Sequence, residues 1–278
     1  QDVKISLERI NEIHQMDDEN GKEGLKTSIE NKDEGIDIKN IMFKYDPHTL
    51  HKTIDDVNIH IPQGKVTAIV GASGSGKTTL IRLMLGYYPV LEGQINIGNT
   101  DINTLNKKWW RRQCGVVMQD GIIFSESIAR NIAVDDGDID KERLLKAAEI
   151  ACIKDYVMAL PLKFNTKIGR DGVGLSQGQK QRILIARAVY KNPDYIFLDE
   201  ATNSLDANNE RSIVENLDKF YKGKTVVIVA HRLSTVKNAD QIVVIDHGKV
   251  VEVGNHESLI AKRGTYYNLV KNQLELGN

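Results

Sequence analysis

The sequence is poor in cysteine, has no excess of charge of either sign and contains no long apolar run. Cys114 and Cys152 lie far apart and outside any C-x-x-C pair, which argues against a disulfide framework and suits a reducing cytosol. The 37 basic and 38 acidic residues leave a net charge of −1, so no positive field draws in nucleic acid. No apolar run reaches the roughly 18 residues that a membrane span needs, and no signal peptide is recognisable.

The most informative run that is present is a glycine-rich loop. It fits the pattern G-x-x-x-x-G-K-[ST] without a mismatch, with a β-branched strand predicted at 65–70 and an apolar helix at 79–85. Glycines let successive N–H groups point at one anion, and the helix N-terminus adds partial positive charge. A purely structural turn is the alternative, but the flanking strand and helix favour a nucleoside triphosphate site. The predicted binding residues are Gly71, Ala72, Ser73, Gly74, Ser75, Gly76, Lys77, Thr78 and Thr79.

Two residues of this loop have specific expected roles. Lys77 can reach the β- and γ-phosphates, and the Thr78 hydroxyl can ligate Mg²⁺.

A second segment supports the same chemistry with a pair of carboxylates. The apolar strand predicted at 195–198 is followed directly by Asp199 and Glu200. Asp199 is predicted to bind Mg²⁺, and Glu200 to orient or deprotonate the attacking water. An acidic pair at a strand end is common, so this interpretation depends on the loop upstream.

Periodicity predicts an α/β chain with three kinds of segment. Strands alternate with helices, which implies a parallel sheet covered on both faces, and the early strands with polar alternation imply an added antiparallel layer. A helical block at 125–165 interrupts the sheet order, and 241–253 reads as a hairpin. The remaining predictions are strands at 36–45, 57–61, 93–98, 115–118 and 225–229, and helices at 178–190, 208–221 and 256–272.

The segment Leu175-Ser176-Gln177-Gly178-Gln179 lies between the loop and the acidic strand and directly precedes a predicted helix. It resembles the LSGGQ signature of the ATP-binding cassette (ABC) family. The resemblance implies a P-loop NTPase core with an antiparallel β layer and a helical subdomain at about 120–190. It also implies that Ser176, Gly178 and Gln179 contact a nucleotide bound to the opposite subunit of a homodimer.

Other family positions are matched one at a time. Tyr45 resembles the aromatic residue that stacks on adenine, although a tyrosine at a sheet edge is the alternative. Gln119 resembles the glutamine that senses Mg²⁺ and the γ-phosphate. Asp206, in Ser204-Leu205-Asp206, resembles the loop that crosses the dimer interface, and His231 resembles the histidine that contacts the γ-phosphate. The catalytic set implied by the resemblance is therefore Glu200, His231 and Lys77.

Two departures from the family pattern stand out. Gln177 replaces the usual first glycine of the signature, but its backbone can still donate a hydrogen bond, so we expect activity to survive. Arg170 stands where exporters usually carry Glu, in a loop that the family uses to touch the membrane domain. The reversed charge puts the details of that contact in doubt.

The segment at 119–132 resembles exporter-type cassettes. We therefore expect residues 1–34 to be the cytoplasmic tail of a transmembrane domain plus a linker, and residues 35–278 to be the nucleotide-binding domain. Because the chain begins with Gln, we expect it to be part of a longer polypeptide at the cytoplasmic face of a bacterial inner membrane. The signature variant and Asn203 resemble peptidase-containing exporters of bacteriocin-like peptides.

Three alternatives remain at this point. The chain could be a soluble non-transport ABC ATPase, although it lacks the long coiled coil of DNA-repair relatives and the second cassette of translation relatives. It could be a degenerate cassette that binds ATP without hydrolysis, against which the intact Glu200 and His231 argue. The basic and aromatic cluster at 107–112 could bind single-stranded nucleic acid, but a solvated helix with its tryptophans turned inward is favoured.

Overall fold

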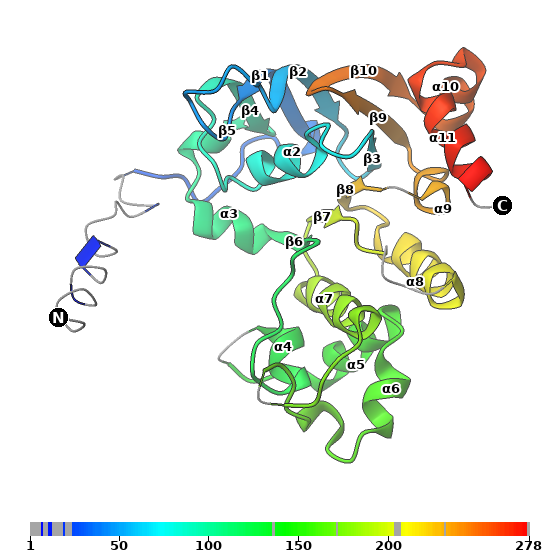
Figure 1. Ribbon diagram of the computed structural model, residues 1–278. Coiled ribbons are helices and arrows are strands. Elements are labelled where there is room, and N and C mark those ends of the chain that lie inside the picture. Colours follow the sequence, from blue (N-terminus) through cyan, green and yellow to red (C-terminus); the bar gives the residue numbers. More distant parts are fainter. Residues whose placement is uncertain are drawn as a thin grey trace.

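The computed structural model describes residues 24–134, 137–170, 172–202, 207–230 and 232–276, together with Leu7, Asn11, Glu12 and Glu19. Two β-sheets form the upper part of the molecule in Figure 1, and a group of helices lies below them. Most of the first part of the tail and linker predicted at residues 1–34 lies outside the described residues. Among the helices that the structure does describe, none has both the length and the apolar character needed to cross a bilayer.

The elements follow one another along the chain with short connections. In order they are η1 (Lys32–Glu34), β1 (Ile36–Phe43), β2 (Ile54–Ile61), β3 (Val66–Val70), α2 (Lys77–Met84), β4 (Glu92–Ile97), β5 (Thr100–Asp101), η2 (Ile102–Thr104), α3 (Lys107–Gln113), β6 (Cys114–Val117), α4 (Ile128–Ala133), α5 (Lys141–Ile150), α6 (Lys154–Ala159), η3 (Lys163–Asn165), α7 (Gln177–Lys191), β7 (Tyr195–Asp199), α8 (Ala207–Phe220), β8 (Thr225–Val229), α9 (Leu233–Val236), β9 (Gln241–Asp246), β10 (Lys249–Gly254), α10 (His256–Lys262) and α11 (Thr265–Leu276).

The central sheet has six strands in the order β10-β9-β3-β8-β7-β6. All of its pairings are parallel except the β9–β10 hairpin. The hairpin turns at His247 and Gly248, both of which have positive φ, as a tight two-residue turn requires. The predicted α/β fold class, with its parallel sheet and C-terminal hairpin, is confirmed.

Residues of the central strands alternate between two hydrophobic cores. In β7, Tyr195 and Phe197 belong to one core, while Ile196 and Leu198 belong to the other. The first core lies between the central sheet, α2 and the antiparallel sheet, and the second holds α7, α8 and the helices that precede α7. Because successive side chains of a strand point to opposite faces, a wholly apolar strand is required where both faces are covered.

The second sheet is antiparallel, with the strand order β2-β1-β4-β5, and it forms the added β layer that the alternating strands predict. Nearby, the basic and aromatic cluster at 107–112 forms α3. Trp110 is fully buried, and its indole Nε1 donates a 2.8 Å hydrogen bond to the Met84 carbonyl. Trp109 packs half-buried against the same core. The inward-facing tryptophans agree with the interpretation of this cluster as a solvated helix.

One predicted helix is wrong in extent. The segment expected to be a single helix at 256–272 consists of α10 and α11, separated at Arg263 and Gly264. Arg263 has a φ of 53°, and its N–H caps the Ile260 carbonyl, which ends α10. The Glu252 carboxylate accepts a 2.7 Å hydrogen bond from the Tyr266 N–H at the start of α11, so the second helix begins on a contact of its own.

Candidate active site

The predicted phosphate loop joins β3 to α2. Gly76 precedes the helix with a φ of 105°, and a Cβ there would lie 2.8 Å from the Thr53 carbonyl oxygen. At Gly71 a Cβ would lie 2.0 Å from the Ile245 carbonyl oxygen. These positions need glycine for two reasons, backbone conformation and close packing against neighbouring chain segments. The loop therefore brings the N-terminal amides of α2 to the carboxyl edge of the central sheet, where ligands bind in this class of fold.

Lys77 lies inside this loop. Its side chain is buried, and Nζ donates to the carbonyl oxygens of Gly71 at 3.0 Å and Ala72 at 2.8 Å. Burial lowers the pKa of Lys77, while the carboxylates of Glu200 and Asp199 act in the opposite direction. A buried ammonium held by two carbonyl groups is well placed to exchange them for phosphate oxygens, which are stronger acceptors.

Asp199 ends β7 as a buried carboxylate, and it has no exposed surface. Neither of its oxygens has a hydrogen-bond partner among the described residues. Burial raises the pKa of Asp199, whereas the neighbouring Thr78 hydroxyl and the positive charges of Arg82 and Lys77 lower it. A buried carboxylate without a hydrogen-bond donor destabilises the folded state unless a ligand balances its charge, and cations are the usual ligands.

These residues fit Mg²⁺. The ion prefers oxygen ligands and is held in phosphate-binding sites by one or two protein groups together with substrate oxygens and waters. Asp199 and Thr78 supply such a pair. Among the residues that the structure describes, no group of three or more His, Cys, Asp or Glu side chains offers an all-protein metal site. The metal would therefore bind together with the triphosphate.

Glu200 follows Asp199 with a left-handed backbone, at a φ of 53°. Its N–H donates to the Val229 carbonyl at 3.0 Å, and its own carbonyl accepts a 2.9 Å hydrogen bond from Gln181 Nε2. A left-handed non-glycine residue is unfavourable and persists where its surroundings hold it, which is common at functional sites. Glu200 therefore lies at the end of β7 beside Asp199, the predicted metal ligand, with its backbone held from both sides.

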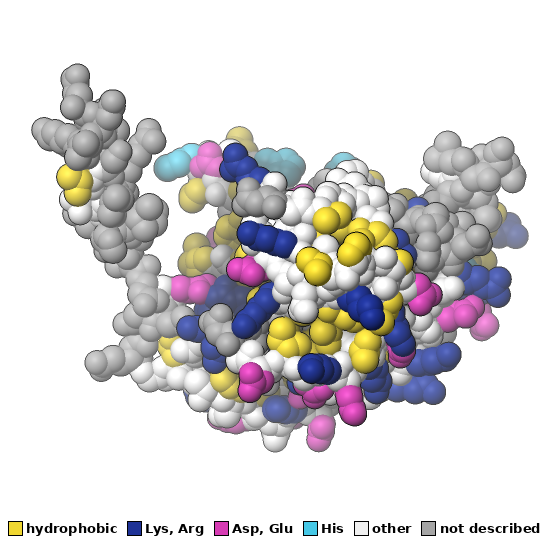
Figure 2. All heavy atoms as spheres, turned by 90° about the horizontal axis from the view of Figure 1, so that it is seen from below, with side chains coloured by type: hydrophobic (Ala, Val, Ile, Leu, Met, Phe, Trp, Pro, Cys, Tyr) yellow, Lys and Arg dark blue, Asp and Glu magenta, His cyan; other side chains and the backbone are white. Residues whose placement is uncertain are grey.

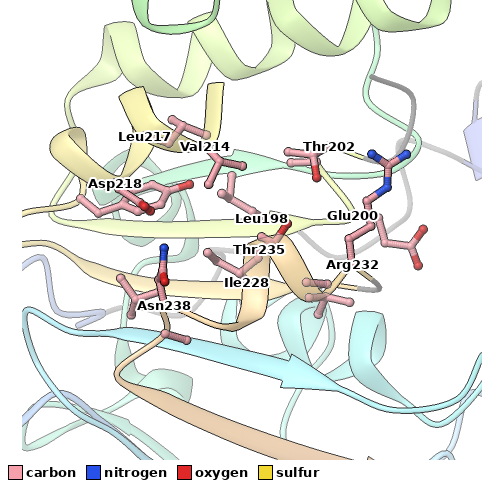
Figure 3. A pocket seen from close by; sticks show the side chains of 16 residues that line it. Leu198, Glu200, Thr202, Val214, Leu217, Asp218, Ile228, Arg232, Thr235 and Asn238 are labelled. Atoms are coloured by element: carbon pink, nitrogen blue, oxygen red, sulfur yellow. The ribbon is translucent and has the colours of Figure 1, made fainter. Parts of the chain in front are cut away.

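A small cavity lies on the inner side of this corner (Figure 3). It has a volume of about 40 Å³, and Glu200, Thr202 and Arg232 lie at one end of it while Asp218 and Asn238 lie at the other. This space can hold a water molecule but not a nucleotide. This cavity is therefore not the predicted triphosphate site.

The serine of the predicted signature begins α7. Ser176 is exposed and forms a capping box, in which its Oγ accepts from Gln179 N–H at 3.2 Å and its N–H donates to Gln179 Oε1 at 2.9 Å. Gly178 and Gln177 form the first turn, and their amides stand at the positive end of a helix that runs to Lys191. The signature therefore forms a second N-terminal helix tip besides that of α2.

The two helix tips belong to opposite faces of the central sheet. The buried residues of α2 lie in the core shared with the antiparallel sheet, and those of α7 lie in the other core. Figure 1 shows α2 above the strands β7 and β8 and α7 below them. One chain thus separates its phosphate loop from its own signature serine, although both motifs are predicted to hold an anion.

Comparison with known proteins agrees with this arrangement. A family model described as ABC transporter matches residues 54–203, which is more than half of the chain.

The chain belongs to the ABC transporter family.

Named relatives and a solved structure extend this result. The chain is 43% identical over 278 residues to the Toxin RTX-III translocation ATP-binding protein of Actinobacillus pleuropneumoniae, covering 99% of this chain and 38% of that protein. It is 41% identical over 276 residues to the Leukotoxin translocation ATP-binding protein LktB of Mannheimia haemolytica, with the same two coverages. The structure of a bacterial Atm1-family ABC exporter with ATP bound superposes with a TM-score of 0.90 at 31% identity, over 97% of this chain and 47% of that one. The chain is thus an ABC ATPase domain that spans about two fifths of the length of these curated relatives.

Within this ABC domain, Tyr45 lies beside the phosphate-loop helix. Its hydroxyl lies 3.0 Å from Thr79 Oγ1, and its ring makes edge contacts with Phe43 and Tyr88 at centroid distances of 5.0 and 5.3 Å. Tyr45 is 48% exposed, which leaves it accessible to a flat ligand. Arg82, which belongs to none of the predicted motifs, also donates from Nη1 to the Tyr45 hydroxyl at 3.4 Å.

The remaining predicted site residues differ in how the structure describes them. Gln119 is exposed in the turn after β6. Asp206 and His231 lie outside the described residues, so their roles stay predictions. Gln179, expected to contact nucleotide, has its side chain engaged in capping its own helix. Gln181 was not predicted as a site residue. Its position two residues after the signature can be read from the sequence, but its contact with Glu200 arises only in the folded chain.

Proposed function

We propose that this domain binds and hydrolyses MgATP to drive export of a polypeptide by an ABC exporter. The observation that carries the proposal is the buried, unpartnered carboxylate of Asp199 beside the Thr78 hydroxyl and the buried Lys77. Such a group of charges fits a triphosphate with its cation far better than it fits a packed interior.

The proposed division of labour follows from chemistry. Lys77, Thr79 and the amides from Gly71 to Thr78 hold the phosphates, and Tyr45 stacks on the base. Thr78, Asp199 and Gln119 hold Mg²⁺, which when bound neutralises charge on the β- and γ-phosphates. Glu200 accepts the proton of the attacking water, and His231 steadies the γ-phosphate.

We further propose a head-to-tail homodimer. The phosphate loop and the Ser176 helix tip lie on opposite sides of one chain, so two chains related by a two-fold axis can each complete the other's site. Ser176, Gly178, Gln179 and Asp206 would then act on the nucleotide of the partner. Gln177 keeps a backbone donor at the same helix tip.

A surface on the helical part suits contact with a transmembrane domain. A groove of about 390 Å³ lies between the segment after β6 and the loop before α7, and Asp120, Ile123, Val173, Leu175 and Lys180 line it. Ile122 and Phe124 are 65% and 46% exposed beside it. Figure 2 shows exposed hydrophobic side chains among Lys and Arg on the lower face of the molecule. Exposed apolar side chains with a charged rim are typical of a protein interface.

The transport part of the proposal rests on similarity. The named relatives translocate toxins and are bacterial, which supports a polypeptide cargo and a position at the cytoplasmic face of the inner membrane. Residues 1–34 would connect to the membrane domain, and 35–278 would form the ATPase, with its helical subdomain at about 120–190. A preceding peptidase segment, as in bacteriocin exporters, stays a narrower prediction that the upstream reading frame would test.

The test is the substitution Glu200→Gln. We expect ATP hydrolysis, followed as phosphate release, to fall by about three orders of magnitude, because the general base is lost while the shape is kept. ATP binding should persist, and the variant should form an ATP-dependent dimer visible by sedimentation. Hydrolysis at the parent rate would remove Glu200 from its proposed role.

A further inference from the structure

The backbone of Glu200 has an unusual conformation within the proposed site. Its φ of 53° is left-handed, a conformation that is unfavourable for a residue with a Cβ and that local contacts must stabilise. Two hydrogen bonds do so here, from Glu200 N–H to the Val229 carbonyl at 3.0 Å and from Gln181 Nε2 to the Glu200 carbonyl at 2.9 Å. The first is a bond to the neighbouring strand β8, whereas the second comes from a side chain on another element.

That second bond comes from the helix that carries the signature. Gln181 lies in the second turn of α7, just after the Ser176 cap. The next residue, Arg182, ties the same turn to the helical insertion, since its Nη1 donates to the Cys152 carbonyl at 3.0 Å and its Nε to the Gly178 carbonyl at 3.3 Å. The start of α7 is therefore connected to both the signature tip and the corner at Glu200.

We propose that Gln181 is a positioning residue for ATP hydrolysis, whose side-chain amide holds Glu200 of its own chain in the left-handed conformation that aims the carboxylate. The inference rests on the proposed role of Glu200 as the base. It adds a physical link between two nucleotide sites, because the helix tip that acts on the partner's nucleotide is one hydrogen bond away from the base of its own chain. Movement of α7 on nucleotide binding at one site then changes the geometry of the base at the other.

The first experiment removes only the donor. Gln181→Met keeps the length of the side chain without its N–H group, and we expect kcat to fall about tenfold with KM for ATP unchanged, as for the loss of one positioning hydrogen bond. The matched control is Gln241→Met, because Gln241 Nε2 also donates to a main-chain carbonyl, that of His60, at 3.0 Å. The control should keep the parent kcat. If the methionine variant does not fold, Gln181→Glu provides a second side chain of the same shape that cannot donate when ionised.

The second experiment asks whether Gln181 acts through Glu200. In a double-mutant cycle, Gln181→Met should lower kcat in the parent but not further in the Glu200→Gln background, because the base it positions is already gone. Independent, multiplying effects would show that Gln181 works by another route and would overturn the inference.

The third experiment asks which chain Gln181 serves. In a mixed dimer, Lys77→Ala in one protomer leaves only the site on the other protomer's phosphate loop active. Placed in the protomer with the intact loop, Gln181→Met should slow hydrolysis about tenfold, and the opposite placement should have the smaller effect. A reversed order would mean that Gln181 acts through the signature in trans, which contradicts the inference. Parent activity of Glu200→Gln would instead contradict the proposed function, so the two failures are distinguishable.

Discussion

The hydroxyl of Tyr45 lies 3.0 Å from the hydroxyl of Thr79, in the first turn of the phosphate-loop helix. This contact joins the segment after β1 to the N-terminus of α2, two parts of the chain that are 34 residues apart. It places a half-exposed aromatic residue next to the loop proposed to hold the triphosphate. The base and the phosphates of one nucleotide can therefore be held by one rigid unit.

Two substitutions of Tyr45 distinguish the contribution of its ring to ATP binding from that of its hydroxyl. Tyr45→Ala should weaken ATP binding about tenfold, because stacking on an aromatic ring contributes about 0.5–1.5 kcal/mol. Tyr45→Phe keeps the ring and loses only the contact with Thr79, so we expect a change of about threefold or less. Titration with a fluorescent ATP analogue measures both. Equal losses for the two variants would show that the hydroxyl, and not the ring, matters.

Asp199→Asn should stabilise the folded protein and abolish ATP hydrolysis. Burial raises the pKa of Asp199, so the folded state binds more protons than the unfolded state between the two pKa values, and this carboxyl weakens folding as the pH rises through that interval and above it. At neutral pH and without Mg²⁺ or nucleotide, we expect the amide to raise the free energy of unfolding by about 1 kcal/mol.

Urea unfolding of parent and variant checks this expectation. The gain should shrink as the pH falls through the raised pKa of Asp199 in the folded state, and it should vanish below the ordinary pKa of a carboxyl group. In the same variant, Mg²⁺-dependent hydrolysis should be lost. A variant that is less stable than the parent at neutral pH would mean that the ionised Asp199 is already compensated within the protein.

Two glycines of the phosphate loop should respond differently to alanine. At Gly71 a Cβ would lie 2.0 Å from the Ile245 carbonyl oxygen, so Gly71→Ala should lower the free energy of unfolding by about 2 kcal/mol or more. At Gly74, which has a φ of 78° and no atom within 4 Å of a built Cβ, only the backbone conformation opposes alanine. The expected cost at Gly74 is about 1 kcal/mol. Thermal unfolding of the pair gives the comparison, and equal costs would contradict the packing argument at Gly71.

Most of the secondary structure could be predicted because its causes are local. The β-branched runs that became β3, β7 and β8 must be strands buried on both faces, and the glycine-rich loop between β3 and α2 has few other uses. The hairpin at His247 and Gly248 follows from two residues that accept positive φ. The C-terminal segment was predicted as one helix, because its break depends on the left-handed backbone of Arg263 and on the hydrogen bond from the Tyr266 N–H to the Glu252 carboxylate, which periodicity does not reveal.

The sequence by itself determined that this chain has a nucleoside triphosphate site, because the chemistry of phosphate and Mg²⁺ binding restricts which residues can stand at which spacing. The order of the motifs then gave the resemblance to the ABC family, which the family comparison confirms. Only the tertiary structure decided that Asp199 is buried without a donor, that the Ser176 helix tip belongs to the opposite face from the phosphate loop, and that Gln181 reaches the Glu200 carbonyl. Each of these depends on which atoms meet when distant segments pack, and burial and long-range hydrogen bonds arise from that packing and not from neighbours in the chain.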